Sequence, residues 1–208
     1  MDRSKIQGIR WKASWLISLL VLSGTALSGQ VPSDNDYNIY SEMIKGDIQK
    51  NERSATVIAK GDAEEIGWLR NAIESNDTAG IKLMTRYLHG ETSERFPDSA
   101  DRVLLLKFCN DKSKETLLQN RFSLPLKIYL EKKFSVNSSD DWNNYYDQFP
   151  GSAGIFEFSA IKYDEQGKTA IFYYSHRRQG LNAHGCVVVM KRTHGIWVFD
   201  YQIYLWQA

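Results

Sequence analysis

The segments Cys186–Arg192 (CVVVMKR) and Ile196–Trp206 (IWVFDYQIYLW) give the clearest indication of secondary structure in this chain. Both are rich in β-branched and aromatic residues, which favour strands, and Thr193-His194-Gly195 between them is typical of a turn. In the second segment, large apolar residues alternate along the chain, as they do in a strand with one covered face. They are Trp197, Phe199, Tyr201, Ile203 and Leu205. We therefore predict an antiparallel hairpin whose covered face packs against helices.

Two segments upstream of this hairpin are also rich in β-branched and aromatic residues. Gly154–Tyr163 (GIFEFSAIKY) and Lys168–His176 (KTAIFYYSH) flank the turn residues Asp164-Glu165-Gln166-Gly167. A longer loop from Arg177 to Gly185 then leads to the strand that begins at Cys186. Consecutive strands with short connections usually pair with each other in antiparallel fashion. The C-terminal part therefore predicts an antiparallel sheet of about four to five strands.

Helical patterns dominate the chain before this sheet. Tyr37–Ile44 and Thr78–Leu88 place apolar residues on one side, and Asp62 followed by Glu65 matches the capping box of a helix start. Ser139–Phe149 is the clearest helix, because Ser139 can cap it and its aromatic residues share one face. The other elements are short strands at Ser54–Lys60 and Pro125–Tyr129, and Arg102–Phe108, which fits a helix or a buried strand equally well. This order predicts an α+β fold, with N-terminal helices packed on one face of the C-terminal antiparallel sheet.

The composition is that of one globular domain. The 208 residues are 42% hydrophobic, 25% charged and 12% aromatic, which excludes intrinsic disorder. A mean hydropathy of -0.44 excludes a polytopic membrane protein. The 26 basic and 25 acidic residues give a formal charge of +1, so no overall positive field attracts nucleic acid and we expect no such partner.

The first 28 residues have the three parts of a secretory signal peptide. Basic residues precede the apolar run Ala13–Leu22 (ASWLISLLVL), and Ser23–Gly29 (SGTALSG) supplies small residues for cleavage. A spanning helix needs about 20 predominantly apolar residues, so this shorter run favours cleavage over the alternative, an uncleaved membrane anchor. We expect a signal peptide at 1–28, a flexible lead at 29–36 and a single α+β domain at 37–208. The mature protein is then secreted or periplasmic and has no membrane partner.

Cleavage of residues 1–28 would change the net charge of the domain, and export would place it in an oxidising environment. Cleavage takes away four of the 26 basic and one of the 25 acidic residues, which leaves a net charge of -2. Outside the cytosol a disulfide between Cys109 and Cys186 is permitted. The alternative is that both are free thiols that pack as small hydrophobic residues.

Several short motifs carry a resemblance to other proteins. They are Phe122–Tyr129 (FSLPLKIY), Phe149-Pro150-Gly151-Ser152, Gly154-Ile155, Ser159, the Gly180–Gly185 loop and Gly195-Ile196-Trp197. With these motifs the chain resembles a group of uncharacterised exported bacterial proteins. The resemblance implies an exported α+β domain, and it implies no activity and no catalytic residue. The loop in this chain, GLNAHG, is bulkier than the pattern of the group.

The longest loop between the C-terminal strands collects the residues that favour ligand binding. Arg177, Arg178, Asn182 and His184 lie in it, with His176 at its entrance. Two guanidinium groups beside imidazoles can bind paired oxygens of a carboxylate or phosphate, so a small anionic or envelope ligand is the expected partner. The alternative is that both arginines are solvated turn residues.

The same region gives the alternative of a small hydrolase or a metal-dependent enzyme that uses His176, His184 and Cys186. A cysteine nucleophile must be exposed and have a histidine as base, but Cys186 begins an apolar run, which is typical of a packed thiol. A zinc site would need ligands in close pairs, and the chain has neither His-Glu-x-x-His nor Cys-x-x-Cys, so we expect no metal and no cofactor. The leading hypothesis is an exported, non-enzymatic binding or envelope-associated module.

Overall fold

The computed structural model describes residues 31–59, 66–87, 97–111, 116–131, 136–179 and 182–208. The signal peptide expected at 1–28 and the helix start expected at Asp62 lie outside the described residues. Within them, no helix is both long enough and apolar enough to cross a membrane.

Helices and strands alternate in the first two thirds of the chain, and the last third is made of strands. The described helices are α1 (Asp34–Asp47), α2 (Ile66–Glu74), α3 (Thr78–Met84), α4 (Ser99–Asn110) and α5 (Ser139–Gln148). The described strands are β1 (Ser54–Ala59), β2 (Thr85–Tyr87), β3 (Lys127–Glu131), β4 (Ser152–Phe158), β5 (Lys162–Tyr163), β6 (Thr169–Arg177), β7 (Ala183–Thr193) and β8 (Ile196–Gln207). The predicted α+β class is therefore confirmed.

One mixed sheet runs through the molecule. Its strand order is β2-β8-β7-β6-β4-β1-β3, and β5 pairs with β6. The pairs that involve β6, β7 and β8 are antiparallel, whereas β1 lies parallel to both β3 and β4. The prediction of a purely antiparallel C-terminal sheet was wrong, because the short strands β1 and β3 join its edge beyond β4. Their partners are distant in sequence, so no local turn indicates the pairing.

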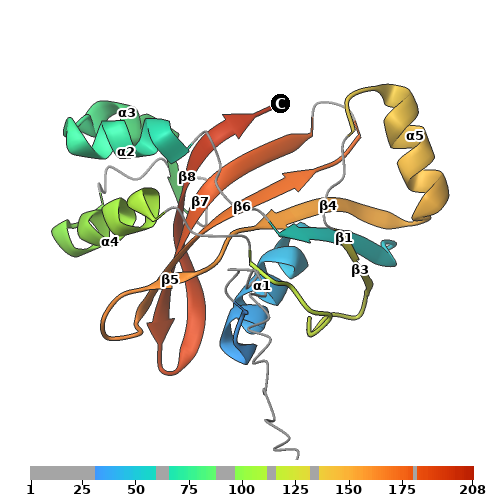
Figure 1. The fold of residues 1–208 in the computed structure, drawn as a ribbon, viewed down its shortest axis with the longest axis horizontal. Coiled ribbons are helices and arrows are strands. Elements are labelled where there is room, and N and C mark those ends of the chain that lie inside the picture. Colours follow the sequence, from blue (N-terminus) through green and yellow to red (C-terminus); the bar gives the residue numbers. More distant parts are fainter. Residues whose placement is uncertain (1–30, 60–65, 88–96, 112–115, 132–135, 180–181) are drawn as a thin grey trace, which may run out of the picture.

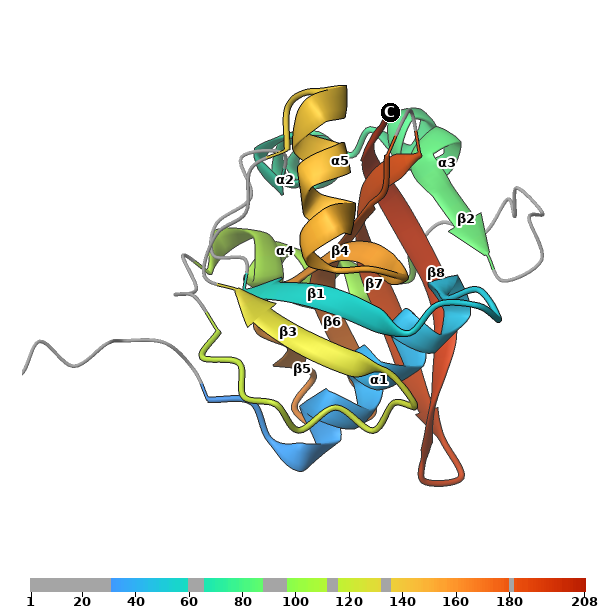
Figure 2. The ribbon, with the colours of Figure 1, turned by 90° about the vertical axis from the view of Figure 1, so that its right-hand side faces the viewer.

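Helices cover both faces of this sheet, and the prediction of one covered face was also wrong. α1 packs on the first face, where Tyr40 and Ile44 join a core with Phe172. On the second face, α2, α3 and α4 lie at one end of the sheet and α5 lies at the other (Figure 1). Figure 2 shows β1 and β3 running between α5 and α1. The central strands require this arrangement, because β6 buries apolar side chains on both of its sides.

Two β-bulges in β8 divide the predicted alternating face. The register with β7 shifts at Asp200 and again at Leu205, so that each is an extra residue in β8. As a result Trp197 and Phe199 pack on the first face with α1, whereas Tyr201 and Ile203 pack on the second face. The side chains of Gln202 and Tyr204 are thereby directed to the first face, where the candidate site lies.

α1 begins earlier than the sequence pattern indicates. Ser33 caps it, and Asp36 accepts a hydrogen bond from the Ser33 amide while the Ser33 hydroxyl accepts one from the Asp36 amide. This reciprocal capping box orders the segment, and Asp36 is buried. The predicted flexible lead at 29–36 is therefore wrong for its last residues, which belong to α1.

Three other elements differ from the predicted bounds. Arg102–Phe108 lies in a helix, α4, which is capped by Asp98. The helix predicted for Thr78–Leu88 ends at Met84 and continues as β2, which pairs with β8. α5 is capped by Ser138 rather than Ser139, one residue before the predicted position.

Candidate functional site

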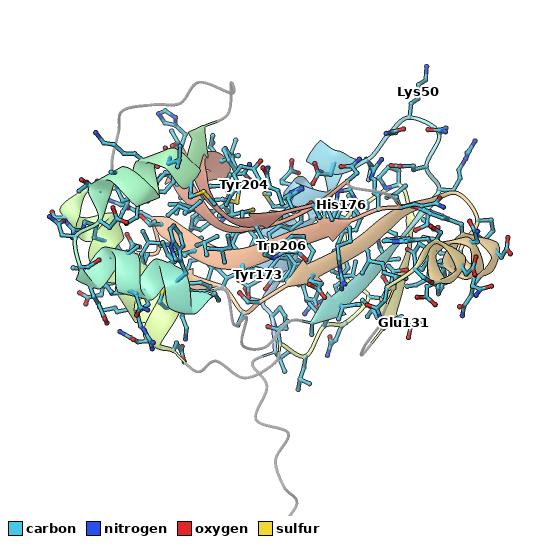
Figure 3. The ribbon with its side chains drawn as sticks, turned by 90° about the horizontal axis from the view of Figure 1, so that it is seen from above. Lys50, Glu131, Tyr173, His176, Tyr204 and Trp206 are labelled. Atoms are coloured by element: carbon cyan, nitrogen blue, oxygen red, sulfur yellow. The ribbon has the colours of Figure 1, made fainter. Side chains whose placement is uncertain are left out.

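A pocket of about 280 Å³ lies on the first face of the sheet, between the C-terminal turn of α1 and strands β6, β7 and β8. Its lining combines carboxylates, aromatic rings, an imidazole and an amide. The lining residues are Glu42, Met43, Gly46 and Asp47 from α1, and Tyr174, His184, Phe199, Gln202 and Tyr204 from the sheet. Figure 3 labels Tyr204 and His176 on the side of the sheet where α1 lies. We take this pocket as the candidate site.

Strand pairing places two of the predicted histidines next to each other. His176 in β6 is directly opposite His184 in β7, and the centroids of the two rings are 6.1 Å apart. His176 is buried, and its ring stacks on Phe156 with centroids 4.2 Å apart. Its Nε2 lies 2.8 Å from the carbonyl oxygen of Ala153, and its Nδ1 lies 3.5 Å from Asp47 Oδ2. Both nitrogens of His176 are thus engaged within the protein.

Asp47, the last residue of α1, is the carboxylate that faces the histidines of the pocket. Its Oδ2 accepts a hydrogen bond from the hydroxyl of Tyr174 and faces His176. Burial acts to raise the pKa of the Asp47 carboxyl, but the interactions with His176 and Tyr174 outweigh it and hold that pKa below its ordinary value. Within the described ranges, its second oxygen, Oδ1, has no hydrogen-bond partner, and the side chain is 32% exposed.

His184 is the second group whose polar atoms are open to the pocket. Its ring contacts the rings of Tyr174 and Tyr204, with centroid separations of 5.8 Å in both cases. Burial lowers the pKa of His184; the nearby Asp47 acts in the opposite direction, and His176 lowers it further. The imidazole is therefore neutral at pH 7, with one donor and one acceptor nitrogen. Among the described residues, neither nitrogen has a hydrogen-bond partner.

The two arginines predicted to bind an anion point to opposite faces of the sheet. Arg177 Nη2 lies 2.6 Å from Glu157 Oε1 on the second face. Arg178 Nη1 lies 3.1 Å from Glu52 Oε1, and its Nη2 also donates to the backbone carbonyl of Asp47. Because each guanidinium already has a carboxylate partner, the structure does not bring them together as an anion clamp.

The predicted loop is also shorter than the sequence indicates. β6 ends at Arg177 and β7 begins at Ala183, so that His184 and Gly185 belong to a strand. Asn182 is exposed, and its carbonyl oxygen accepts a hydrogen bond from the Arg178 amide. His194 lies in the turn of the β7–β8 hairpin and is exposed. Of the predicted binding residues, the structure therefore places only His184 in the lining of the pocket, with His176 behind it.

The two cysteines are free thiols, and the disulfide considered between them is not formed. Cys186 belongs to the core on the first face, whereas Cys109 packs with the core on the second face. Burial raises the pKa of the Cys109 thiol to about 12. Burial, together with the nearby Asp47, raises the pKa of Cys186 far above its ordinary value, and its Sγ donates to Gln202 Oε1. Neither thiol is therefore an ionised nucleophile at neutral pH.

Several residues of the pocket were not predicted from the sequence. Tyr174 lies two residues before His176 in the same strand, so the period of a strand places both on one face and could have indicated it. Gln202 and Tyr204 share a face with Cys186 only because of the bulge at Asp200. Asp47 has no signal in the sequence, because it reaches the sheet only through the packing of α1.

The described residues contain no group of three or more histidine, cysteine or acidic side chains that could hold a metal ion. No protein-family model, no curated protein and no solved structure matches the chain.

Proposed function

We propose that the protein is an exported, non-enzymatic binding module that takes a small ligand in the pocket between α1 and strands β6 to β8. The observation that carries this proposal is the pairing of the polar groups around the pocket. Most of them bond to one another, and Asp47 Oδ1 and the His184 nitrogens have no hydrogen-bond partner among the described residues, so they can contact a ligand. Prearranged polar groups beside aromatic and apolar surface are typical of small-molecule sites.

The hydrogen bonds around the pocket also argue against the alternative function, an enzyme that uses His176, His184 and Cys186. A nucleophile needs a base within hydrogen-bond reach, but the Cys186 thiol is fully buried and donates to Gln202. His176 cannot act as that base, because its nitrogens face Ala153 and Asp47. His184 is open to the pocket, but the described lining holds no serine, threonine or cysteine that it could activate, so it serves a bound ligand better as a hydrogen-bonding group.

Export is the second part of the proposal, and it rests on the sequence. The basic start, the apolar run and the small residues before Gln30 support secretion into the periplasm or the medium. The resemblance to exported bacterial proteins agrees with this location. A binding module outside the cytosol would meet small nutrients or envelope components, and either can occupy a pocket of this size.

The pocket can be closed without disturbing the fold. Gly46 lies in α1 and lines the pocket, and a Cβ added to it meets no atom within 4 Å. Leucine is also a better helix former than glycine. The variant Gly46→Leu should therefore fold and fill the pocket with an apolar side chain. Gly67→Leu is the matched control, because Gly67 lies in α2 and is equally open.

We expect ligand-observed NMR with a library of small cationic, neutral and anionic fragments to give hits with the mature protein and with Gly67→Leu. Gly46→Leu should lose these hits, since its side chain occupies the same space. Esters and amides included in the library should remain intact, because binding involves no reaction. The same hits with all three proteins would place ligand binding elsewhere, and hydrolysis that Gly46→Leu abolishes would favour the enzyme.

A further inference from the structure

The charged side chains that line the pocket are acidic. Glu42 and Asp47 line it from α1, and no lysine or arginine is among its described lining residues. Lys45 is the basic residue of α1, and it forms a solvent-exposed ion pair with Glu42 without itself lining the pocket. Arg178 is held by Glu52 and by the backbone carbonyl of Asp47. The pocket thus presents negative charge to a ligand.

The end of α1 adds to this negative potential. Aligned peptide dipoles give the C-terminus of a helix a partial negative charge, and the last two residues of the 14-residue helix, Gly46 and Asp47, both line the pocket. A carboxylate at this end of a helix is unfavourable unless a donor or a cation compensates it. His176 and Tyr174 compensate one oxygen of Asp47. The other oxygen is left without a partner in the described structure.

The free polar atoms fit a group that donates several hydrogen bonds. Asp47 Oδ1 only accepts, and neutral His184 offers one acceptor nitrogen. A protonated primary amine has three N–H donors, carries the charge that the carboxylates attract, and can satisfy both acceptors. The remaining lining, from Met43, Phe199 and Tyr204, gives apolar and aromatic surface for the body of the ligand. Aromatic faces also attract ammonium groups.

We propose that the pocket binds a small organic cation, a primary ammonium group that donates to Asp47 Oδ1 and to His184 while its organic body packs on Phe199 and Tyr204. This inference rests on the proposed binding function and names its ligand class. The proposed cation replaces the anionic ligand that was expected from Arg177 and Arg178. Arg177 faces the opposite side of the sheet, and Arg178 pairs with Glu52.

Three probes of similar size separate charge from shape. Isothermal titration of the mature protein with n-butylammonium should show saturable binding. Butan-1-ol, which keeps the chain without the charge, and butyrate, which reverses the charge, should bind at least ten-fold more weakly, because a hydrogen bond to a charged group is the stronger kind. Gly46→Leu should abolish the binding of n-butylammonium.

Substitution of Asp47 and Glu42 tests which carboxylate binds the ammonium group. Asp47→Asn should weaken n-butylammonium at least ten-fold and leave butan-1-ol unchanged, and circular dichroism checks that the variant folds. Glu42→Gln offers a second variant on an exposed side chain, and we expect a smaller, two- to five-fold loss because Glu42 is shared with Lys45. Glu165→Gln is the control, because Glu165 is exposed on the β5–β6 turn away from this pocket, and it should change nothing.

The outcomes separate this inference from the proposed function. If butan-1-ol or butyrate binds as tightly as n-butylammonium and Gly46→Leu abolishes that binding, the pocket is a ligand site but its proposed preference for a cation is wrong. If calcium binds in an Asp47-dependent way and n-butylammonium does not, the site belongs to a metal and the cation is again wrong. If neither these probes nor any member of the fragment library binds in a way that Gly46→Leu abolishes, the binding function itself fails.

Discussion

Replacement of Gly154 with alanine is expected to lower the free energy of unfolding by about 3 kcal/mol or more. Gly154 has a φ of +109°, a backbone conformation that residues with a Cβ rarely adopt. A Cβ at this position would also lie 2.4 Å from the carbonyl oxygen of Arg177 in the paired strand β6. Backbone strain and overpacking therefore act together. Urea denaturation followed by circular dichroism measures the loss.

Gly67→Ala is the matched control for this glycine. Its added Cβ meets no atom within 4 Å, and alanine favours the helix, so stability should stay equal or rise by up to about 1 kcal/mol. An equal denaturation midpoint for Gly154→Ala and the unchanged protein would show that β4 and β6 do not approach as closely as described.

Arg178→Ala is expected to cost about 3 kcal/mol of unfolding free energy, the lower end of the range for a buried ion pair, because this pair is largely but not fully buried. The side chain of Arg178 is 14% exposed and that of Glu52 is 10% exposed, so neither charge is well solvated. The substitution leaves Glu52 without its partner and removes a donor from the carbonyl oxygen of Asp47. It should also loosen the end of α1 that forms the pocket.

Lys45→Ala is the control, because the ion pair of Lys45 with Glu42 is exposed and should contribute less than about 0.5 kcal/mol. Thermal and urea denaturation of both variants make the comparison. A loss for Arg178→Ala as small as that for Lys45→Ala would mean that Arg178 is the solvated turn residue that the sequence alone allows, rather than a clamp on α1.

Local patterns in the sequence predicted much of the fold. The turn at Thr193-His194-Gly195 is observed: the hairpin turns at His194 and Gly195, and both have positive φ. The helix predicted from Ser139 differs by one residue at its cap. These features depend on neighbouring residues, which a single sequence displays. The parallel pairing of Ser54 with Lys127 depends on residues far apart in the chain, and no turn indicates it.

The candidate site was harder to predict for the same reason. His176 and His184 could be chosen because both lie in one short stretch of sequence. Asp47, which lies more than a hundred residues earlier, reaches them only through the packing of α1. Consecutive Arg177 and Arg178 suggest a joint role, but Arg177 ends β6 and pairs with Glu157, whereas Arg178 follows the strand and pairs with Glu52. The bulge at Asp200 is a further feature without a clear signal in the sequence.

The most direct test of the pocket is ¹H–¹⁵N NMR of the imidazole groups during titration with n-butylammonium. In the free protein, His184 should titrate below its ordinary pKa of 6.5, because burial disfavours the charged ring. A bound cation disfavours that charge further, so saturating n-butylammonium should shift the His184 signals and lower its pKa again. His194, exposed at the hairpin turn, should not respond. An unchanged His184 at saturation, or equal responses from His184 and His194, would contradict the assignment of this pocket as the ligand site.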